Sequence, residues 1–127
     1  MQFPDSQIEI TVKDRKFTID YPNTGQLIDI ERMKATIAGG RYESIAKQGS
    51  NSSTYSKFLI DMTSFFNVLC PQLIESLKVS SLLELKAQDS NMLLRIYVKD
   101  ILPWLMKWED LLSSDPEETV NEEAGEE

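Results

Sequence analysis

Residues 92–112 constrain the fold of this chain more than any other segment. Apolar side chains recur there at helical spacing and form one stripe, made up of Leu93, Tyr97, Ile101, Trp104, Trp108 and Leu111. Three further residues widen that stripe beyond half of the helix circumference: Leu94, Val98 and Leu105. In a chain of 127 residues, we expect another polypeptide to supply part of the cover that so wide a stripe needs. Pro103 is expected to bend this helix or to divide it.

Two alternating runs near the N-terminus predict a β-hairpin at about residues 8–21. Apolar and polar residues alternate over 8–12 and again over 17–21, and a short charged segment joins the two runs. The apolar residues expected on one face are Ile8, Ile10, Val12, Phe17, Ile19 and Tyr21. An isolated hairpin is marginal in water, so this face is expected to pack on the helices that follow.

Further helical patterns follow the hairpin. One helix is expected over residues 24–38, with Asn23 or Thr24 as its cap and two glycines as its stop. Residues 49–53 have the composition of a flexible loop. A second pattern begins at Thr54, is interrupted at Cys70–Pro71 and continues to about residue 78. The fold class is therefore predicted as α+β, mostly α, with the hairpin on a small bundle of about four to five helices.

Acidic residues concentrate at the C-terminal end. Residues 113–127 hold seven carboxylates and no Lys or Arg, whereas residues 1–112 hold 14 acidic and 13 basic residues. With Val120 as its one large apolar residue, the acidic segment is expected to be a disordered tail behind a single domain, 1–112. The acidic balance argues against a nucleic-acid ligand. No apolar run reaches the ~18 residues of a membrane span, so a cytoplasmic protein is expected.

The types of residue present exclude the common catalytic sets. The chain has no histidine and one cysteine, Cys70, which is interpreted as a buried structural thiol. Asp61 and Asp100 lie at the edges of apolar stripes, where acid–base work is conceivable, but solvated carboxylates explain them as well. Arg95 and Lys99 form a small basic spot, interpreted as a solvated face. We therefore expect no enzymatic activity, no metal site and no cofactor.

Several apolar side chains are candidates for contact with a protein partner. Trp104 and Trp108 are one helical turn apart and share a face, and aromatic residues are common interface anchors. Packing in the core is the alternative interpretation of this pair. Ile60 lies on the otherwise polar side of its helix, which favours a partner or oligomer contact. The candidate partner-binding residues are Leu94, Val98, Leu105, Trp104, Trp108 and Ile60.

Within residues 7–112, four segments taken in order carry a resemblance to a known family. They are the hairpin sequence ending in Tyr21-Pro22, the following Thr24–Glu31, the run Phe58–Met62 leading to Leu69-Cys70-Pro71, and Leu102-Pro103-Trp104. With the acidic C-terminus, they resemble the small tail assembly chaperones of long-tailed bacteriophages.

The resemblance implies a non-enzymatic protein of the host cytoplasm. Such chaperones bind the long helical tape measure protein, keep it soluble and help to recruit tail tube subunits. Two other hypotheses stay open. One is a structural or oligomer-forming virion protein, such as a head–tail connector or tail-completion subunit, in which hairpin edges pair between copies. The other is an acidic mimic of nucleic acid, which the near-neutral charge of residues 1–112 disfavours.

Overall fold

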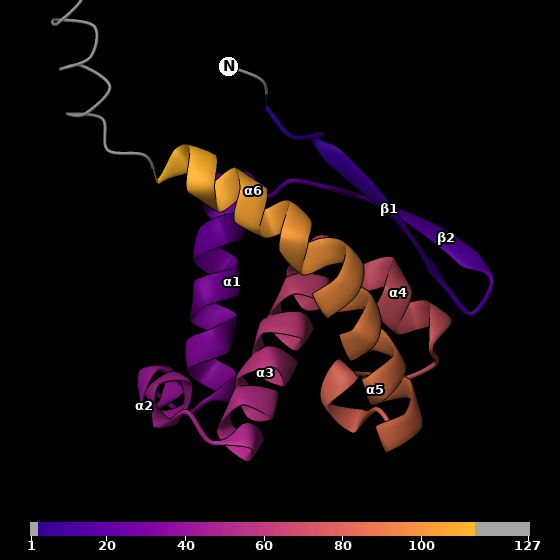
Figure 1. Ribbon diagram of the computed structural model, residues 1–127. Coiled ribbons are helices and arrows are strands. Elements are labelled where there is room, and N and C mark those ends of the chain that lie inside the picture. The colour runs from indigo at the N-terminus through magenta and orange to yellow at the C-terminus, as the bar shows by residue number, and fades with distance from the viewer. Residues whose placement is uncertain (1–2, 114–127) are drawn as a thin grey trace, which may run out of the picture.

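The computed structural model describes residues 3–113, and the predicted acidic tail lies outside them from residue 114 onward. The fold is α+β and mostly α, as predicted (Figure 1). In chain order the elements are β1 (Gln7–Val12), β2 (Arg15–Asp20), α1 (Thr24–Ile37), α2 (Tyr42–Gln48), α3 (Asn51–Leu69), α4 (Pro71–Ser76), a 3-10 turn (Leu82–Glu84), α5 (Ala87–Ile96), a π-helical turn (Tyr97–Ile101) and α6 (Leu102–Leu112).

The hairpin forms with the predicted face turned inward. β1 and β2 pair antiparallel, with Ile8 opposite Ile19 and Ile10 opposite Phe17. Their link is a two-residue turn in which Lys13 and Asp14 have φ values of 48° and 69°. Positive φ at both turn positions matches the right-handed twist of paired strands. The Lys13 ammonium also lies 3.0 Å from the Asp89 carboxylate, which ties the turn to α5.

Local capping explains where α1 and α3 begin. The Asn23 side chain accepts from the Gln26 backbone N–H at 2.9 Å, and the Gln26 side chain accepts from the Asn23 N–H at 3.0 Å. At α3, the Ser50 hydroxyl accepts from the Ser53 N–H at 3.1 Å. The helix therefore begins at Asn51, and the prediction of a loop through residue 53 is wrong.

The C-terminal helical path bends where the proline was expected to act. The π-helical turn separates α5 from α6, and Pro103 occupies the first turn of α6 (Figure 1). A proline inside a helix lacks an N–H and crowds the carbonyl of the preceding turn. Local widening of the helix relieves that conflict, so the path changes direction without a loop.

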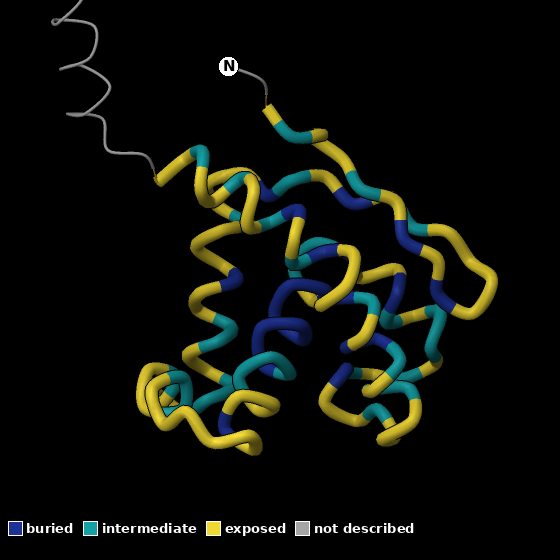
Figure 2. Tube along the Cα trace, in the orientation of Figure 1, coloured by how far each residue is buried: buried dark blue, intermediate teal, exposed yellow. Residues whose placement is uncertain are grey.

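The core forms around α3. The helices α1 and α2 pack on one side of α3, and α4 and α5 pack on the other (Figure 1). The buried run along the second half of α3 is the darkest stretch in Figure 2. The hairpin packs on these helices through Ile10, Val12 and Ile19. These three side chains belong to one apolar cluster with residues of α3 to α6. Cys70 belongs to the same cluster, and burial raises the pKa of its thiol.

Candidate functional site: the outer face of the C-terminal helices

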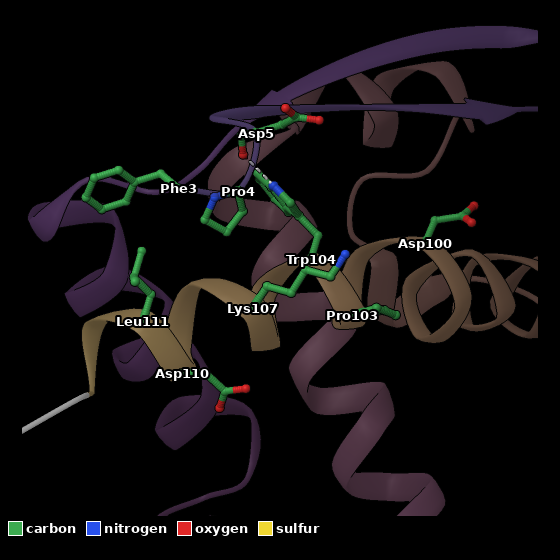
Figure 3. A pocket seen from close by; sticks show the side chains of 9 residues that line it. All are labelled: Phe3, Pro4, Asp5, Asp100, Pro103, Trp104, Lys107, Asp110 and Leu111. Atoms are coloured by element: carbon green, nitrogen blue, oxygen red, sulfur yellow. Dashed lines mark hydrogen bonds between the residues drawn. The ribbon is translucent and has the colours of Figure 1, made fainter. Parts of the chain in front are cut away.

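The two tryptophans of α6 are covered by the chain's own N-terminal segment. Both indole N–H groups donate to one acceptor, the backbone carbonyl of Asp5, at 2.7 Å from Trp104 and 3.0 Å from Trp108. Phe3, Pro4 and Asp5 thus lie along α6 and form one wall of an open groove of about 760 Å³ (Figure 3). A carbonyl that satisfies two indoles fixes the segment against the helix.

Aromatic stacking completes this cover. The Trp108 ring lies between Tyr21 and Phe3, with centroid distances of 4.6 Å and 5.7 Å, both in stacked geometry. Tyr21 also meets Trp104 edge-on at 5.6 Å, which leaves Trp104 only 7% exposed. The prediction that another polypeptide must cover the tryptophan face is therefore wrong for Trp104. The prediction failed because helical periodicity describes the helix alone and gives no sign of the N-terminal segment that packs on it.

Two other candidate residues, Ile60 and Leu105, are also covered by other parts of the protein. Ile60 was predicted on a polar, open face of its helix, but it is 8% exposed. Because α1 and α2 cover that face of α3, the neighbouring Thr63 and Ser64 are buried as well. The prediction of a surface contact through Ile60 is therefore wrong. Leu105 is half-buried and turns toward an internal cavity beside α1.

Of the remaining candidates, Leu94 is 8% exposed and belongs to the apolar core, whereas Val98 lies at the surface. The prediction of an open surface contact at Leu94 is therefore wrong, as it is for Ile60. With the side chains of Arg95 and Lys99, Leu94 and Val98 line a shallow, almost wholly apolar depression of about 400 Å³, which we call the Val98 patch. Val98 is 40% exposed. Arg95 and Lys99 are exposed and make no ion pair within residues 3–113. The predicted basic spot thus borders an apolar surface with its charges unpaired.

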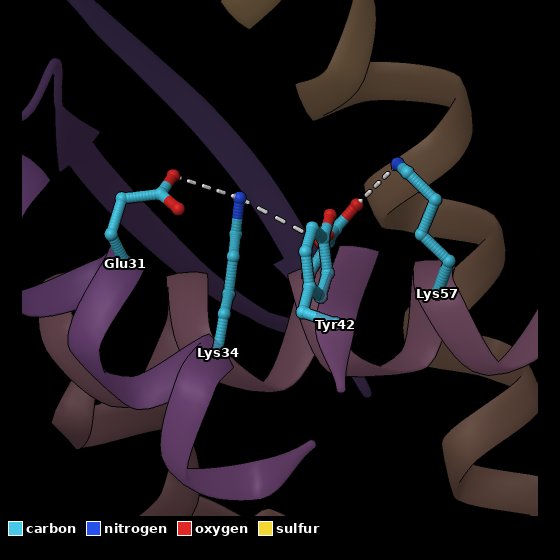
Figure 4. Close-up of polar contacts among 5 residues, drawn as sticks. Glu31, Lys34, Tyr42 and Lys57 are labelled. Carbon is cyan, nitrogen blue, oxygen red and sulfur yellow. Dashed lines mark hydrogen bonds and ion pairs between the residues drawn. The ribbon is translucent and has the colours of Figure 1, made fainter. Parts of the chain in front are cut away.

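Asp61 is buried, which corrects its interpretation as a solvated carboxylate. It accepts a hydrogen bond from the Tyr42 hydroxyl at 2.5 Å, and the Lys57 ammonium lies 2.8 Å from its other oxygen (Figure 4). Lys34 lies 3.7 Å from Asp61 and 3.2 Å from Glu31. Burial and the bond to Asp61 raise the pKa of Tyr42. This cluster ties α1 and α2 to α3, and its carboxylate is fully engaged.

The sequence signal for this cluster is visible in retrospect. Lys57 precedes Asp61 by four residues, the spacing of an ion pair along one helix. The contributions of α1 and α2 have no such local signal, because they depend on how the helices pack.

The described part of the chain offers no arrangement typical of a metal centre. Within residues 3–113, no group of three or more Cys, Asp or Glu side chains could hold a metal ion. No helix in that range is long and apolar enough to cross a bilayer. Comparisons with protein-family models, with curated proteins and with solved structures find no match for this chain.

Proposed function

We propose that this protein is a non-enzymatic assembly chaperone, of the kind that holds the helical tape measure protein of a phage tail in solution and helps to recruit tail tube subunits. The observation that carries the proposal is the Val98 patch, where exposed apolar surface adjoins two cations that form no ion pair with any of the described residues 3–113. The resemblance of residues 7–112 to tail assembly chaperones supports the same class of function.

The chemistry of the Val98 patch defines the segment that it would bind. An amphipathic helix buries its apolar face in such a surface through residues three or four positions apart. Arg95 and Lys99, one turn apart on this chain, favour a partner helix with carboxylates beside its apolar stripe. The apolar contact supplies affinity, and the two cations set the orientation.

Co-expression with a tape measure protein, which the proposal expects to be encoded near this chain, tests the proposal. We expect the wild-type chain to raise the soluble fraction of that protein and to elute with it from a sizing column. Val98→Glu places a carboxylate in the apolar depression and should lower the amount of co-eluting partner about tenfold, the effect of losing one central contact. Because Val98 is 40% exposed, this variant should fold normally.

Met106→Glu is the matched control, because Met106 is 52% exposed on α6 and does not line the Val98 patch. It should retain the partner. The proposal fails if the solubility and elution of the tape measure protein are the same with and without this chain. A chain that elutes by itself as a closed ring and ignores the partner would instead support the structural-protein hypothesis.

A further inference from the structure

A cavity of about 190 Å³ lies between α1 and α6, away from the Val98 patch. Its apolar walls include Leu27 from α1 and Leu102 and Leu105 from α6. The Asp61 cluster and Tyr97 line the same cavity. An apolar cavity of about 150 Å³ can admit a molecule of the size of benzene. The space is therefore large enough for a small organic group as well as for water.

One polar group in this cavity has no partner. Tyr97 is 4% exposed, yet its hydroxyl makes no hydrogen bond within residues 3–113. In the same range, Ser64 Oγ is the one fully enclosed side-chain oxygen or nitrogen that lacks a partner. The Tyr97 hydroxyl is therefore not fully enclosed by protein, and Tyr97 lines the cavity. Such a hydroxyl is free to hydrogen-bond with a group that enters the cavity.

Charge around the cavity is unbalanced. Among the described residues, three carboxylates and two ammonium groups line it, so the lining carries one net negative charge, and the third carboxylate, Glu109, is exposed to solvent. Asp61 and Glu31 are engaged by lysines, whereas Glu109 forms no ion pair with any residue from 3 to 113. Burial raises the pKa of Tyr97, and the charges of Asp61 and Glu109 add to that rise. The hydroxyl thus lies in the field of both carboxylates.

We propose that this cavity binds a cation, an alkylammonium or guanidinium group on a short apolar stem. Its N–H groups would donate to the Tyr97 hydroxyl and pair with Glu109, while the stem would pack on Leu102 and Leu105. An anion would meet a lining whose two ammonium groups already pair with carboxylates and whose net charge is negative, and an apolar molecule would leave the hydroxyl unpaired. The same chemistry is offered by a free amine and by a lysine or arginine side chain of a partner. This site does not depend on the proposed chaperone function.

Titration with n-butylammonium, followed by NMR of ¹³C-labelled tyrosine rings, tests the proposal. We expect saturable shifts of the Tyr97 resonances and none for Tyr55, which is exposed and does not line the cavity. n-Butanol has the same stem without the charge and should give much weaker shifts. The proposal is overturned if Tyr97 does not respond to the amine, or if the alcohol binds equally well.

Two variants assign the contacts. Tyr97→Phe should weaken amine binding about tenfold, the loss of a hydrogen bond to a charged group. It should leave the unfolding midpoint unchanged, because the hydroxyl has no hydrogen-bond partner among residues 3–113. Glu109→Gln should weaken amine binding about fivefold, whereas Asp110→Asn, beside it but outside the cavity, should not. Wild-type affinity in both cavity variants would refute the site.

A third arm distinguishes the source of the cation. Blocked lysine, Nα-acetyl-lysine-N-methylamide, presents the same ammonium on a peptide backbone. Binding at least as tight as that of n-butylammonium assigns the site to a side chain of a partner protein. Binding of the free amine alone assigns it to a small molecule, and both outcomes support the cation site.

Discussion

Replacing Trp104 with alanine is expected to lower the free energy of unfolding by about 3–4 kcal/mol, the usual loss for a buried tryptophan. Trp104 is 7% exposed, packs edge-on against Tyr21 and donates to the Asp5 carbonyl at 2.7 Å. The substitution removes apolar contact with the core and leaves that carbonyl with one indole donor instead of two. Urea denaturation followed by circular dichroism at 222 nm measures the loss.

Two comparisons separate the packing of Trp104 from its hydrogen bond. Trp104→Phe keeps most of the apolar contact and should cost about half as much, since it loses the N–H donor and part of the ring. Met106→Ala, on the exposed side of α6, should change the free energy of unfolding by less than about 0.5 kcal/mol. Equal effects of Trp104→Ala and Met106→Ala would show that the N-terminal segment does not hold the tryptophan.

Asp61→Ala is expected to lower the free energy of unfolding by about 2–3 kcal/mol. The substitution removes the acceptor of the Tyr42 hydroxyl and the counterion of Lys57 and Lys34. Loss of one member of a fully buried ion pair costs about 3–5 kcal/mol. Here the cost is smaller, because both lysines keep part of their side chains in water and can turn toward it. The same urea denaturation measures the difference.

Asp61→Asn tests whether the hydrogen bond from Tyr42 or the neutralisation of the lysines contributes more to the stability of the fold. The amide carbonyl can still accept from Tyr42 but no longer neutralises the lysines, so we expect roughly half of the alanine effect. Asp110→Ala removes an exposed carboxylate that forms no ion pair within residues 3–113 and should be nearly neutral. A stable Asp61→Ala protein would mean that α1 and α2 are held on α3 by apolar contact alone.

The features predicted correctly from the sequence are those with local causes. The hairpin follows from strict alternation, and α1 follows from the Asn23 cap and the glycines beyond its end. The break at Cys70–Pro71 follows from the conformations that proline forbids. Each of these signals depends on residues within a few positions of one another, so the sequence alone is enough to predict the structure there.

The features missed depend on contacts between distant segments. Residues 42–48 form the helix α2, which none of the predicted helices includes, and its Tyr42 is held by Asp61 of α3. Residues 3–6 carried no pattern, yet Asp5 bonds to two tryptophans about a hundred positions away. The partner surface was placed too broadly for the same reason. Helical periodicity gives the width of an apolar stripe but not which of the chain's own segments cover it.

The two surfaces considered for a partner differ in how far the chain's own residues cover them. The tryptophan side of α6 is occupied by residues 3–6 and the hairpin, whereas the Val98 patch is open. Apolar surface beside unpaired cations recognises a helix with the opposite pattern of charge. The central claim of the proposal is that a helical partner binds at the Val98 patch, and that the tryptophans serve the fold.

NMR of the complex with a helical segment of the tape measure protein tests that claim most directly. One sample labelled in its leucine and valine methyl groups and in its tryptophan indoles reports on both surfaces at once. The account predicts large shifts of the Leu94 and Val98 methyl resonances, with the indole N–H resonances of Trp104 and Trp108 unchanged. Shifts of the indole resonances with no change at Leu94 and Val98 would contradict it.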